Sequence, residues 1–331
     1  MKTIILEPPA ELNQMRPISP YQTLSAPFMN RPILAHQIQH LNDLGITNVA
    51  VLTEEVLPAE LQDGARWGIE LQIAATLPSD FVDDPHEELL VLPGATLIDL
   101  DLETFLVKHR ETDNELSQAV TEKDTSMPPA TAFSPVLIAG RHVIEGIERR
   151  GPMNALRLRN LIARLENDMI AVKAVKGILN LADHGRYWEA HERAFRAQPL
   201  VDPRTPGFLL REGLQIGLDT RVDDSVVVEG QVLIGENSRI HSDVRLEGFV
   251  VIGDNVVIDK GTTVRDSIIL SDTYVGTELT LDAAVVNQSL LYHHGHGSAT
   301  HVEDGFILGP SRLGNRRGGG GFSRVRSSDQ A

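Results

Sequence analysis

The chain has 331 residues, a formal net charge of −16, a pI of about 5.1 and no cysteine. That length allows two domains with separate cores, the acidic charge argues against a nucleic-acid partner, and the lack of cysteine excludes disulfides, thiolate metal sites and a cysteine nucleophile. The first residues lack a basic targeting segment and no apolar run reaches membrane-spanning length, so we predict a cytoplasmic protein without a membrane partner.

The first part of the chain has the pattern of an α/β domain. A β-branched strand at residues 2–6 is followed by helical apolar spacing at Leu34, Ile38 and Leu41, which stops at Gly45, and by a strand at 48–52. This strand–helix–strand unit predicts a parallel sheet with covered faces. Further strands are predicted at 70–74, 88–92, 118–121, 135–139 and 169–175, and helices at 102–109, 141–149 and 155–166. We assign residues 1–198 to this domain and 199–211, which is rich in proline, to a linker.

A six-residue repeat organises the next part of the chain. Every sixth residue is aliphatic: Ile216, Val222, Val228, Ile234, Ile240, Leu246, Ile252, Ile258, Val264 and Leu270. A second, largely apolar series follows four residues later, and glycine or Asn/Asp is expected at the corners. A period of six is typical of a parallel β-helix, and the repeat resembles the left-handed hexapeptide-repeat form. We therefore predict a left-handed parallel β-helix over 212–291, with a register slip after Leu270.

Three stretches, in order, resemble one enzyme family. Residues 29–49 contain NRPIL and GITNV, similar to the family's NRPIL and GITDV. Residues 89–102, LLVLPGATLIDLDL, resemble VLNGDVLTDLDL, and residues 175–190 resemble GYWLDIGTPEDYLEA, with Tyr187 and Ala190 in place. The family is that of the sugar-1-phosphate nucleotidyltransferases, of the mannose-1-phosphate guanylyltransferase type. The resemblance implies a Rossmann-like nucleotidyltransferase domain, a sugar nucleotide as ligand and Mg²⁺ as the cofactor of the active enzymes.

The positions that carry chemistry in this family differ here. The resemblance places its phosphate-binding lysine at Ala26 and its two metal-binding aspartates at Ala95 and Asn180. The glycine-rich loop, whose amides would cradle phosphates, is replaced by Glu7-Pro8-Pro9-Ala10-Glu11. Proline removes amide donors and glutamate repels phosphate. The joint change predicts a degenerate site without catalysis.

Several other residues are candidates for binding. Arg16 could contact a phosphate, or be a solvated loop residue. Asp99 and Asp101 could hold a metal in a rearranged site, although capping of the helix that follows is the better explanation. His36 and His40 lie one helical turn apart without the glutamate of a zinc motif. The cluster of His293, His294 and His296, close to His301, could hold a metal, or be a surface loop.

Three functions remain open. The first is a catalytically inactive, nucleotidyltransferase-like protein with a regulatory or scaffolding role in sugar-nucleotide or surface-polysaccharide metabolism. Such a protein could bind an NDP-sugar and partner a catalytic nucleotidyltransferase, as a non-catalytic subunit does in this family. The second is an active enzyme that makes an NDP-sugar from a rearranged site. The third is a hexapeptide-repeat acyltransferase that uses His241 as a base between subunits.

Two expectations concern assembly and the tail. Because the end of a β-helix must be capped or paired, we predict a homo-oligomer through residues 212–291. Residues 292–331 are rich in histidine, glycine and arginine, which predicts a disordered tail.

Overall fold

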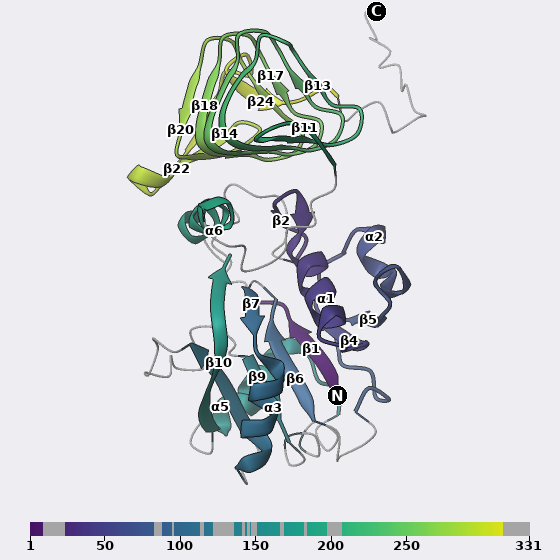
Figure 1. The fold of residues 1–331 in the computed structure, drawn as a ribbon. Helices are drawn as coiled ribbons and strands as arrows, with labels where there is room; N and C mark the ends of the chain where they lie inside the picture. Colours follow the sequence, from purple (N-terminus) through teal and green to yellow (C-terminus); the bar gives the residue numbers. More distant parts are fainter. Residues whose placement is uncertain are drawn as a thin grey trace, which may run out of the picture.

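The computed structural model describes residues 1–8, 24–82, 88–94, 96–112, 116–121, 136–140, 143, 146, 151–165, 169–181, 184–196 and 207–313. It contains two domains, which we call the α/β domain (residues 1–196) and the coil domain (residues 207–313) (Figure 1). None of the helices among these residues is long and apolar enough to span a bilayer.

An eight-stranded sheet with the order β5-β4-β1-β6-β9-β8-β10-β7 forms the α/β domain. Pairs β1–β4, β1–β6, β4–β5 and β8–β10 are parallel, whereas β6–β9, β8–β9 and β7–β10 are antiparallel. This confirms the predicted α/β fold with a mainly parallel sheet. The strands are β1 (Lys2–Leu6), β4 (Asn48–Leu52), β5 (Glu70–Ala74), β6 (Leu89–Pro93), β7 (Thr96–Leu100), β8 (Leu116–Thr121), β9 (Val136–Ala139) and β10 (Met169–Asn180).

Apolar side chains cover both faces of this sheet, as a parallel sheet requires. In β1, Ile5 faces a core shared with α1 and α3, whereas Ile4 and Leu6 face a second core that includes Leu158 of α5. The predicted helices near 33, 102 and 155 are confirmed, and the one predicted at 141–149 falls largely outside the described residues. The helices are α1 (Ile33–Asp43), α2 (Ala59–Gln62), the short 3-10 helix η2 (Gly64–Trp67), α3 (Leu102–Glu111), α5 (Ala155–Arg164) and α6 (His184–Arg196).

The coil domain stacks short parallel strands around an aliphatic core, and its turns form a triangle in Figure 1. Ile216 lies opposite Ile234, and Ile234 lies opposite Ile252, three hexads later in each case. Ile234, Ile240 and Leu246 are at most 3% exposed, as the predicted register requires. The strands are β12 (Leu214–Ile216), β13 (Arg221–Val222), β14 (Val227–Ile234), β15 (Arg239–Ile240), β16 (Arg245–Ile252), β17 (Val257–Ile258), β18 (Thr263–Ile269), β19 (Thr273–Val275), β20 (Thr280–Asp282) and β21 (Ala284–Asn287).

The register slip comes earlier than predicted. Ile269, not Leu270, lies opposite Ile252, because a single residue of β18, Asp266, stands opposite the two residues Gly248 and Phe249 of β16. The Asp266 carboxylate accepts a hydrogen bond from Phe249 N at 3.1 Å and so closes this shortened corner. Leu270 is still buried, but it packs in the cluster between the two domains instead of the coil core.

Both predicted boundaries of the β-helix also differ from the structure. A strand, β11 (Phe208–Arg211), pairs with β12 and lies inside the predicted linker. Beyond residue 291, the chain forms more ordered structure within the predicted tail: β22 (Leu290–His293), a 3-10 turn η4 (His294–His296), β23 (Ser298–His301) and β24 (Leu308–Pro310). Strands β22 and β24 pair antiparallel with β21 and β19 of the last coil, and β23 pairs antiparallel with β22, so together they cap this end. Residues 314–331 of the tail lie outside the described residues.

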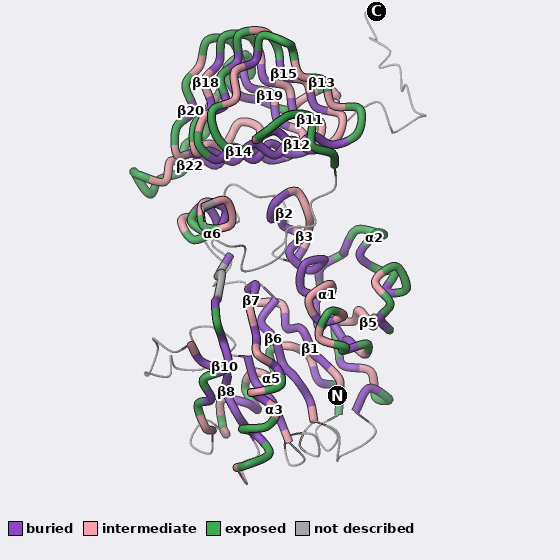
Figure 2. The backbone as a smooth tube through the Cα atoms, viewed as in Figure 1, coloured by how far each residue is buried: buried purple, intermediate pink, exposed green. Residues whose placement is uncertain are grey.

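A hairpin and a helix connect the two domains (Figures 1 and 2). The hairpin β2 (Pro27–Phe28) and β3 (Arg31–Pro32) turns at Met29 and Asn30, both with positive φ, as in a tight two-residue turn. Asn30 Nδ2 donates to Ile252 O at 2.7 Å, and Trp188 Nε1 of α6 donates to Asp266 O at 2.7 Å. Apolar residues of the hairpin, α6 and the coil form one buried cluster around these bonds.

Candidate functional site

Open α/β sheets bind ligands at the carboxyl ends of their parallel strands, which here are the ends of β1, β4 and β6. Glu7 follows β1 and extends its side chain across to the end of β4. Its Oε2 accepts hydrogen bonds from Thr53 Oγ1 at 2.6 Å and from Glu54 N at 3.1 Å. A carboxylate therefore uses the donors that a bound phosphate would need at this edge.

The turn after β6 is closely packed at the same edge. Gly94 N donates to Leu6 O at 2.8 Å, and a Cβ at this position would lie 2.5 Å from Leu24 Cδ2 and 2.9 Å from Leu6 O. Only glycine fits here, and its amide is already used within the protein. The degenerate position Ala95 comes next and lies outside the described residues, as does Arg16.

The other two degenerate positions lie close to this edge. Ala26 is 2% exposed and packs in the apolar cluster between the domains, with its carbonyl accepting from Ile33 N at 2.9 Å. Its methyl group brings no positive charge to the edge. Asn180 pairs through its backbone with Thr96, the first residue of β7, and its side chain is not described.

Asp99 and Asp101 do not lie at this edge. Asp99 is three residues along β7 from Thr96, a distance of about 10 Å at the usual rise of a strand. Asp101 Oδ1 accepts from Thr104 N at 3.0 Å and caps α3, and this bond lowers the pKa of Asp101 below its usual range. The capping interpretation of Asp101 is confirmed. Among the described residues, no group of three or more His, Asp or Glu side chains is arranged to hold a metal ion.

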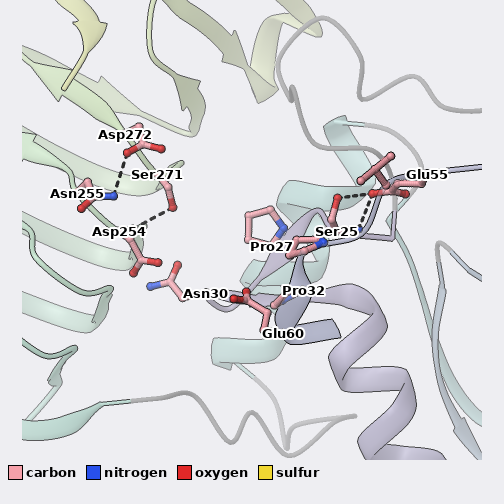
Figure 3. Close-up of a pocket in the computed structure, with 12 residues that line it drawn as sticks. Ser25, Pro27, Asn30, Pro32, Glu55, Glu60, Asp254, Asn255, Ser271 and Asp272 are labelled. Atoms are coloured by element: carbon pink, nitrogen blue, oxygen red, sulfur yellow. Dashed lines mark hydrogen bonds between the residues drawn. The ribbon is translucent and has the colours of Figure 1, made fainter. Parts of the chain in front are cut away.

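A cavity of about 500 Å³ lies between the domains, and we call it the interdomain cavity (Figure 3). Ser25, Pro27 and Glu55 of the α/β domain face the corner of the coil across it. The described residues that line it include no lysine or arginine but four carboxylates: Glu55, Glu60, Asp254 and Asp272. Sequence patterns could not reveal this cavity, because its two walls are about two hundred residues apart in the chain.

Two of these carboxyl groups have raised pKa values. Burial raises the pKa of Glu55, although its oxygens accept from Leu24 N, Ser25 N and Ser25 Oγ. Burial also raises the pKa of Asp254, and the carboxylates of Glu236, Asp272 and Glu60 shift it in the same direction. The cavity is acidic because carboxyl groups line it without a cation among the described residues, and the raised pKa values show that crowding and burial oppose the charge of two of them. It suits a cation or a neutral polar group and opposes a nucleotide or a sugar phosphate.

The coil wall of the interdomain cavity is a ladder of corner residues. Asn237 Nδ2 donates to Asn255 Oδ1 at 2.8 Å, and Asn255 Nδ2 donates to Asp272 Oδ1 at 2.9 Å. All three residues have positive φ, which asparagine and aspartate tolerate better than most residues. This confirms the expectation that Asn or Asp occupies corners of the coil, and it gives Asn255 and Asp272 a structural role.

The C-terminal histidines lie at the domain interface and the coil surface. His294 stacks on Trp188 of α6, with ring centroids 4.2 Å apart, and the rings of His293 and His296 are 4.4 Å apart. His294 therefore helps to attach α6 to the coil, and no third ligand joins these residues within the described part of the chain. His241 is exposed at a coil corner and does not line the interdomain cavity.

Two buried histidines hold the hairpin in place. His36 Nε2 lies 2.8 Å from Phe28 O, and His191 Nε2 accepts from Met29 N at 3.2 Å while its Nδ1 lies 2.9 Å from Tyr187 O. Burial lowers the pKa of His36 to about 4 and that of His191 to about 3, so both are neutral. His191 was not singled out from the sequence. The sequence does place His191 one helical turn after Tyr187, on the same face of the helix, and this spacing could have indicated that the two residues share an environment.

Comparison with known proteins supports part of the predicted resemblance. Residues 228–311 match the family model described as the GMPPB C-terminal domain, a domain of mannose-1-phosphate guanylyltransferase. This match confirms, for the coil domain, the predicted resemblance to sugar-1-phosphate nucleotidyltransferases. No curated protein matches the chain.

The chain is also similar to solved structures. One is named as a putative glucose-1-phosphate thymidylyltransferase from Bacillus anthracis, crystallised with a sucrose. The similarity covers 60% of this chain and 96% of that chain, with 13% identity and a TM-score of 0.44.

Proposed function

We propose that this protein is a nucleotidyltransferase-like component of sugar-nucleotide metabolism that does not catalyse nucleotidyl transfer. It acts instead as a regulatory or scaffolding subunit beside a catalytic nucleotidyltransferase. The match of residues 228–311 to a mannose-1-phosphate guanylyltransferase domain supports the sugar-nucleotide context. A role in surface-polysaccharide synthesis and a cytoplasmic location remain predictions.

The position of Glu7 is the observation that carries the non-catalytic part of the proposal. Nucleotidyl transfer depends on positioning a triphosphate and neutralising its charge. At the carboxyl edge of the sheet, Glu7 supplies a negative charge and occupies the Thr53 hydroxyl and the Glu54 amide. Pro8 follows at once and has no N–H to offer. A triphosphate at this edge would therefore meet repulsion where it needs donors.

The alternative of an active enzyme requires a metal site elsewhere. Asp101 is used as a helix cap, and Asp99 lies away from the edge on β7, so these two aspartates do not support such a site. An NDP-sugar ligand also remains a prediction, and the negative interdomain cavity is not where we expect it to bind. For the acyltransferase alternative, exposed His241 brings no further support.

A turnover assay tests the proposal directly. The purified full chain is incubated with Mg²⁺, each common nucleoside triphosphate and a panel of hexose 1-phosphates, and released pyrophosphate is measured. We expect no release above the protein-free background. Turnover of about one per second or faster, within the ordinary range of enzymes, would overturn the proposal. Loss of that turnover in Asp99→Asn, but not in His241→Asn, would then identify a rearranged metal site.

A binding experiment tests the role of Glu7 itself. Glu7→Gln keeps the shape of the side chain but removes its charge, so we expect affinity for a nucleoside triphosphate to rise by about tenfold or more, as measured by calorimetry. The matched control is Glu54→Gln, which removes a neighbouring carboxylate but keeps the amide that Glu7 binds. Equal affinities in the wild type and both variants would show that Glu7 does not exclude the nucleotide.

The proposed regulatory role requires a partner protein. We expect the full chain to bind the catalytic sugar-1-phosphate nucleotidyltransferase of the same cell and to change its rate or its response to the NDP-sugar product. Co-expression, co-purification and product-inhibition curves measure both effects. If the catalytic enzyme neither binds this chain nor changes its kinetics, the regulatory proposal fails while the absence of catalysis stands.

A further inference from the structure

The interdomain cavity brings together carboxyl groups of both domains (Figure 3). Glu55 and Glu60 belong to the α/β domain, and the described residues that line the cavity include no lysine or arginine. Asp254 and Asp272 belong to the coil domain. Burial raises the pKa of Asp254, and neighbouring carboxylates, among them Glu60 across the cavity, raise it further. The two walls therefore repel each other when their carboxyl groups are charged, and a cationic occupant would remove this repulsion.

The described part of the chain ends beside this cavity. Strand β24 pairs with β19, and Pro310 at its end lies opposite Thr273. Directly after β24, Ser311 N donates a hydrogen bond to Asp272 O at 2.7 Å. Asp272 lines the cavity, and the last described residue is Leu313. Residues 314–331 therefore begin within a few residues of the coil wall of the cavity.

Residues 314–331 have the charge that the cavity lacks. They contain four arginines and one aspartate, and they follow directly on the exposed Arg312 and Leu313. An extended chain spans up to about 3.6 Å per residue, so the stretch from Ser311 to Arg316 covers up to about 18 Å and brings the first arginines within reach of the cavity. A guanidinium group carries five N–H donors and can bind a carboxylate through two hydrogen bonds at once.

Two other undescribed segments begin or end near the domain connection, and neither has this charge. Residues 9–23 contain one glutamate and one arginine, and residues 197–206 contain one aspartate and one arginine, so each brings no net charge. The apolar surface of the cavity also suits residues 314–331. Val56 lines the cavity with 90% of its surface exposed, and Phe322 lies between the arginines. Among these three segments, residues 314–331 complement the cavity best.

We propose that residues 314–331, which we call the arginine tail, dock in the interdomain cavity of their own chain, where the arginines pair with carboxylates of both domains. The docked tail acts as a latch between the domains. It neutralises the repulsion between their walls and adds ion pairs to the hydrogen bonds that Asn30 and Trp188 already form across the connection. This latch goes beyond the proposed function and does not depend on whether the protein is catalytic.

Spin labelling of the full chain tests this proposal. The chain has no cysteine, so Ser323→Cys carries a single thiol for a nitroxide within the arginine tail. We expect the label to broaden the methyl NMR signals of Val56 and to leave those of Val107 sharp, because α3 lies at the end of the α/β domain away from the coil (Figure 1). Salt at about 1 M, where the Debye length is about 3 Å, should remove the broadening. Sharp Val56 signals at low salt would overturn the proposal, as would broadening that arises only between different chains in a mixed sample.

A peptide titration distinguishes the cavity from other acidic surfaces. In the full chain, all four arginines of the arginine tail are changed to glutamine to free the cavity, and a peptide with the sequence of residues 314–331 is added. We expect binding by calorimetry, and Glu60→Gln with Asp254→Asn should weaken it by about tenfold or more, because two charged acceptors become neutral. The matched control is Glu70→Gln with Asp243→Asn, which removes two charges from exposed residues outside the cavity and should keep the affinity. Absence of binding, or an affinity that both pairs of substitutions change equally, would overturn the proposal.

Discussion

The α/β domain and the coil domain differ in how their residues reach their neighbours. In the regular coils, core residues pair with their equivalents three hexads before and after, so Ile234 lies between Ile216 and Ile252. In the α/β domain, the carboxyl edge of the sheet is formed by the ends of strands that are far apart in sequence. Glu7, after β1, accepts a hydrogen bond there from Thr53, after β4. The comparison teaches that a repeat fixes side-chain direction locally, whereas a site in an α/β domain depends on the loops between distant strands.

The largest expected effect tests the core of the coil. Ile252 is fully buried, so Ile252→Asp would place an unpaired carboxylate in the aliphatic core and should lower the free energy of unfolding by about 5 kcal/mol. Denaturant unfolding followed by circular dichroism measures the loss. Ile252→Val, which removes one methylene, should cost about 1 kcal/mol. Equal stability of Ile252→Asp and the wild type would contradict the register of the coil.

The next prediction concerns the connection between the two domains. Trp188 donates to Asp266 O and stacks on His294, so Trp188→Ala should cost about 3 kcal/mol and uncouple the domains. Calorimetry should then resolve two unfolding transitions instead of a more cooperative one. The chain's other tryptophan provides the control, because Trp67→Ala lies within the α/β domain and should leave the coupling unchanged. A single, unchanged transition in Trp188→Ala would mean that other contacts couple the domains.

The next effect depends on pH and is small near neutral pH. Burial lowers the pKa of His191 from 6.5 to about 3, so the unfolded chain takes up a proton at this residue before the folded protein does. Its contribution to stability is full above pH 6.5 and is lost as the pH falls toward 3, by up to about 1.4 kcal/mol for each pH unit. His36 acts in the same direction, with a pKa of about 4.

Variants separate this histidine effect from other titrations. Unfolding free energies of the wild type and His191→Gln are compared from neutral to acidic pH, and we expect a shallower acid loss in the variant. Glu55 and Asp254 titrate in both proteins, so their effects cancel in the comparison. Ile252→Val, which changes no titratable group, is the control and should shift the curve without changing its slope. Parallel curves for the wild type and His191→Gln would contradict the assigned pKa.

The smallest prediction concerns the two aspartates that could have been metal ligands. Asp101→Ala removes the cap of α3 and should destabilise the α/β domain, whereas Asp99→Ala removes no cap and should destabilise it less. Thermal unfolding with and without Mg²⁺ measures both. Stabilisation of the wild type by Mg²⁺ that either variant abolishes would instead show that these aspartates bind the metal.

The sequence alone determined the two-domain division and the direction of most coil side chains. Aliphatic residues recur every six positions from Ile216 to Val264. Because successive coils have the same length, these residues stack above one another and all point into the same core. The capping role of Asp101 was also readable, since a cap acts within three residues of the helix start. Of the degenerate positions, Ala26 is buried in the structure. Ala95 and the candidate Arg16 lie outside the described residues.

Only the tertiary structure decided the remaining features. The register slip at Asp266 depends on a hydrogen bond from Phe249 N in the neighbouring coil to the Asp266 carboxylate. The sequence pattern does not show this contact, and it therefore predicted the slip after Leu270. Strands β22 to β24 form because the last coil offers them an open edge, although their histidine- and glycine-rich sequence predicts disorder. The interdomain cavity joins Glu55 to Asp254 by domain packing, and burial together with like charges then raises their pKa values. Contacts between residues so far apart in the chain leave no local pattern, because their spacing is set by the packing of whole domains.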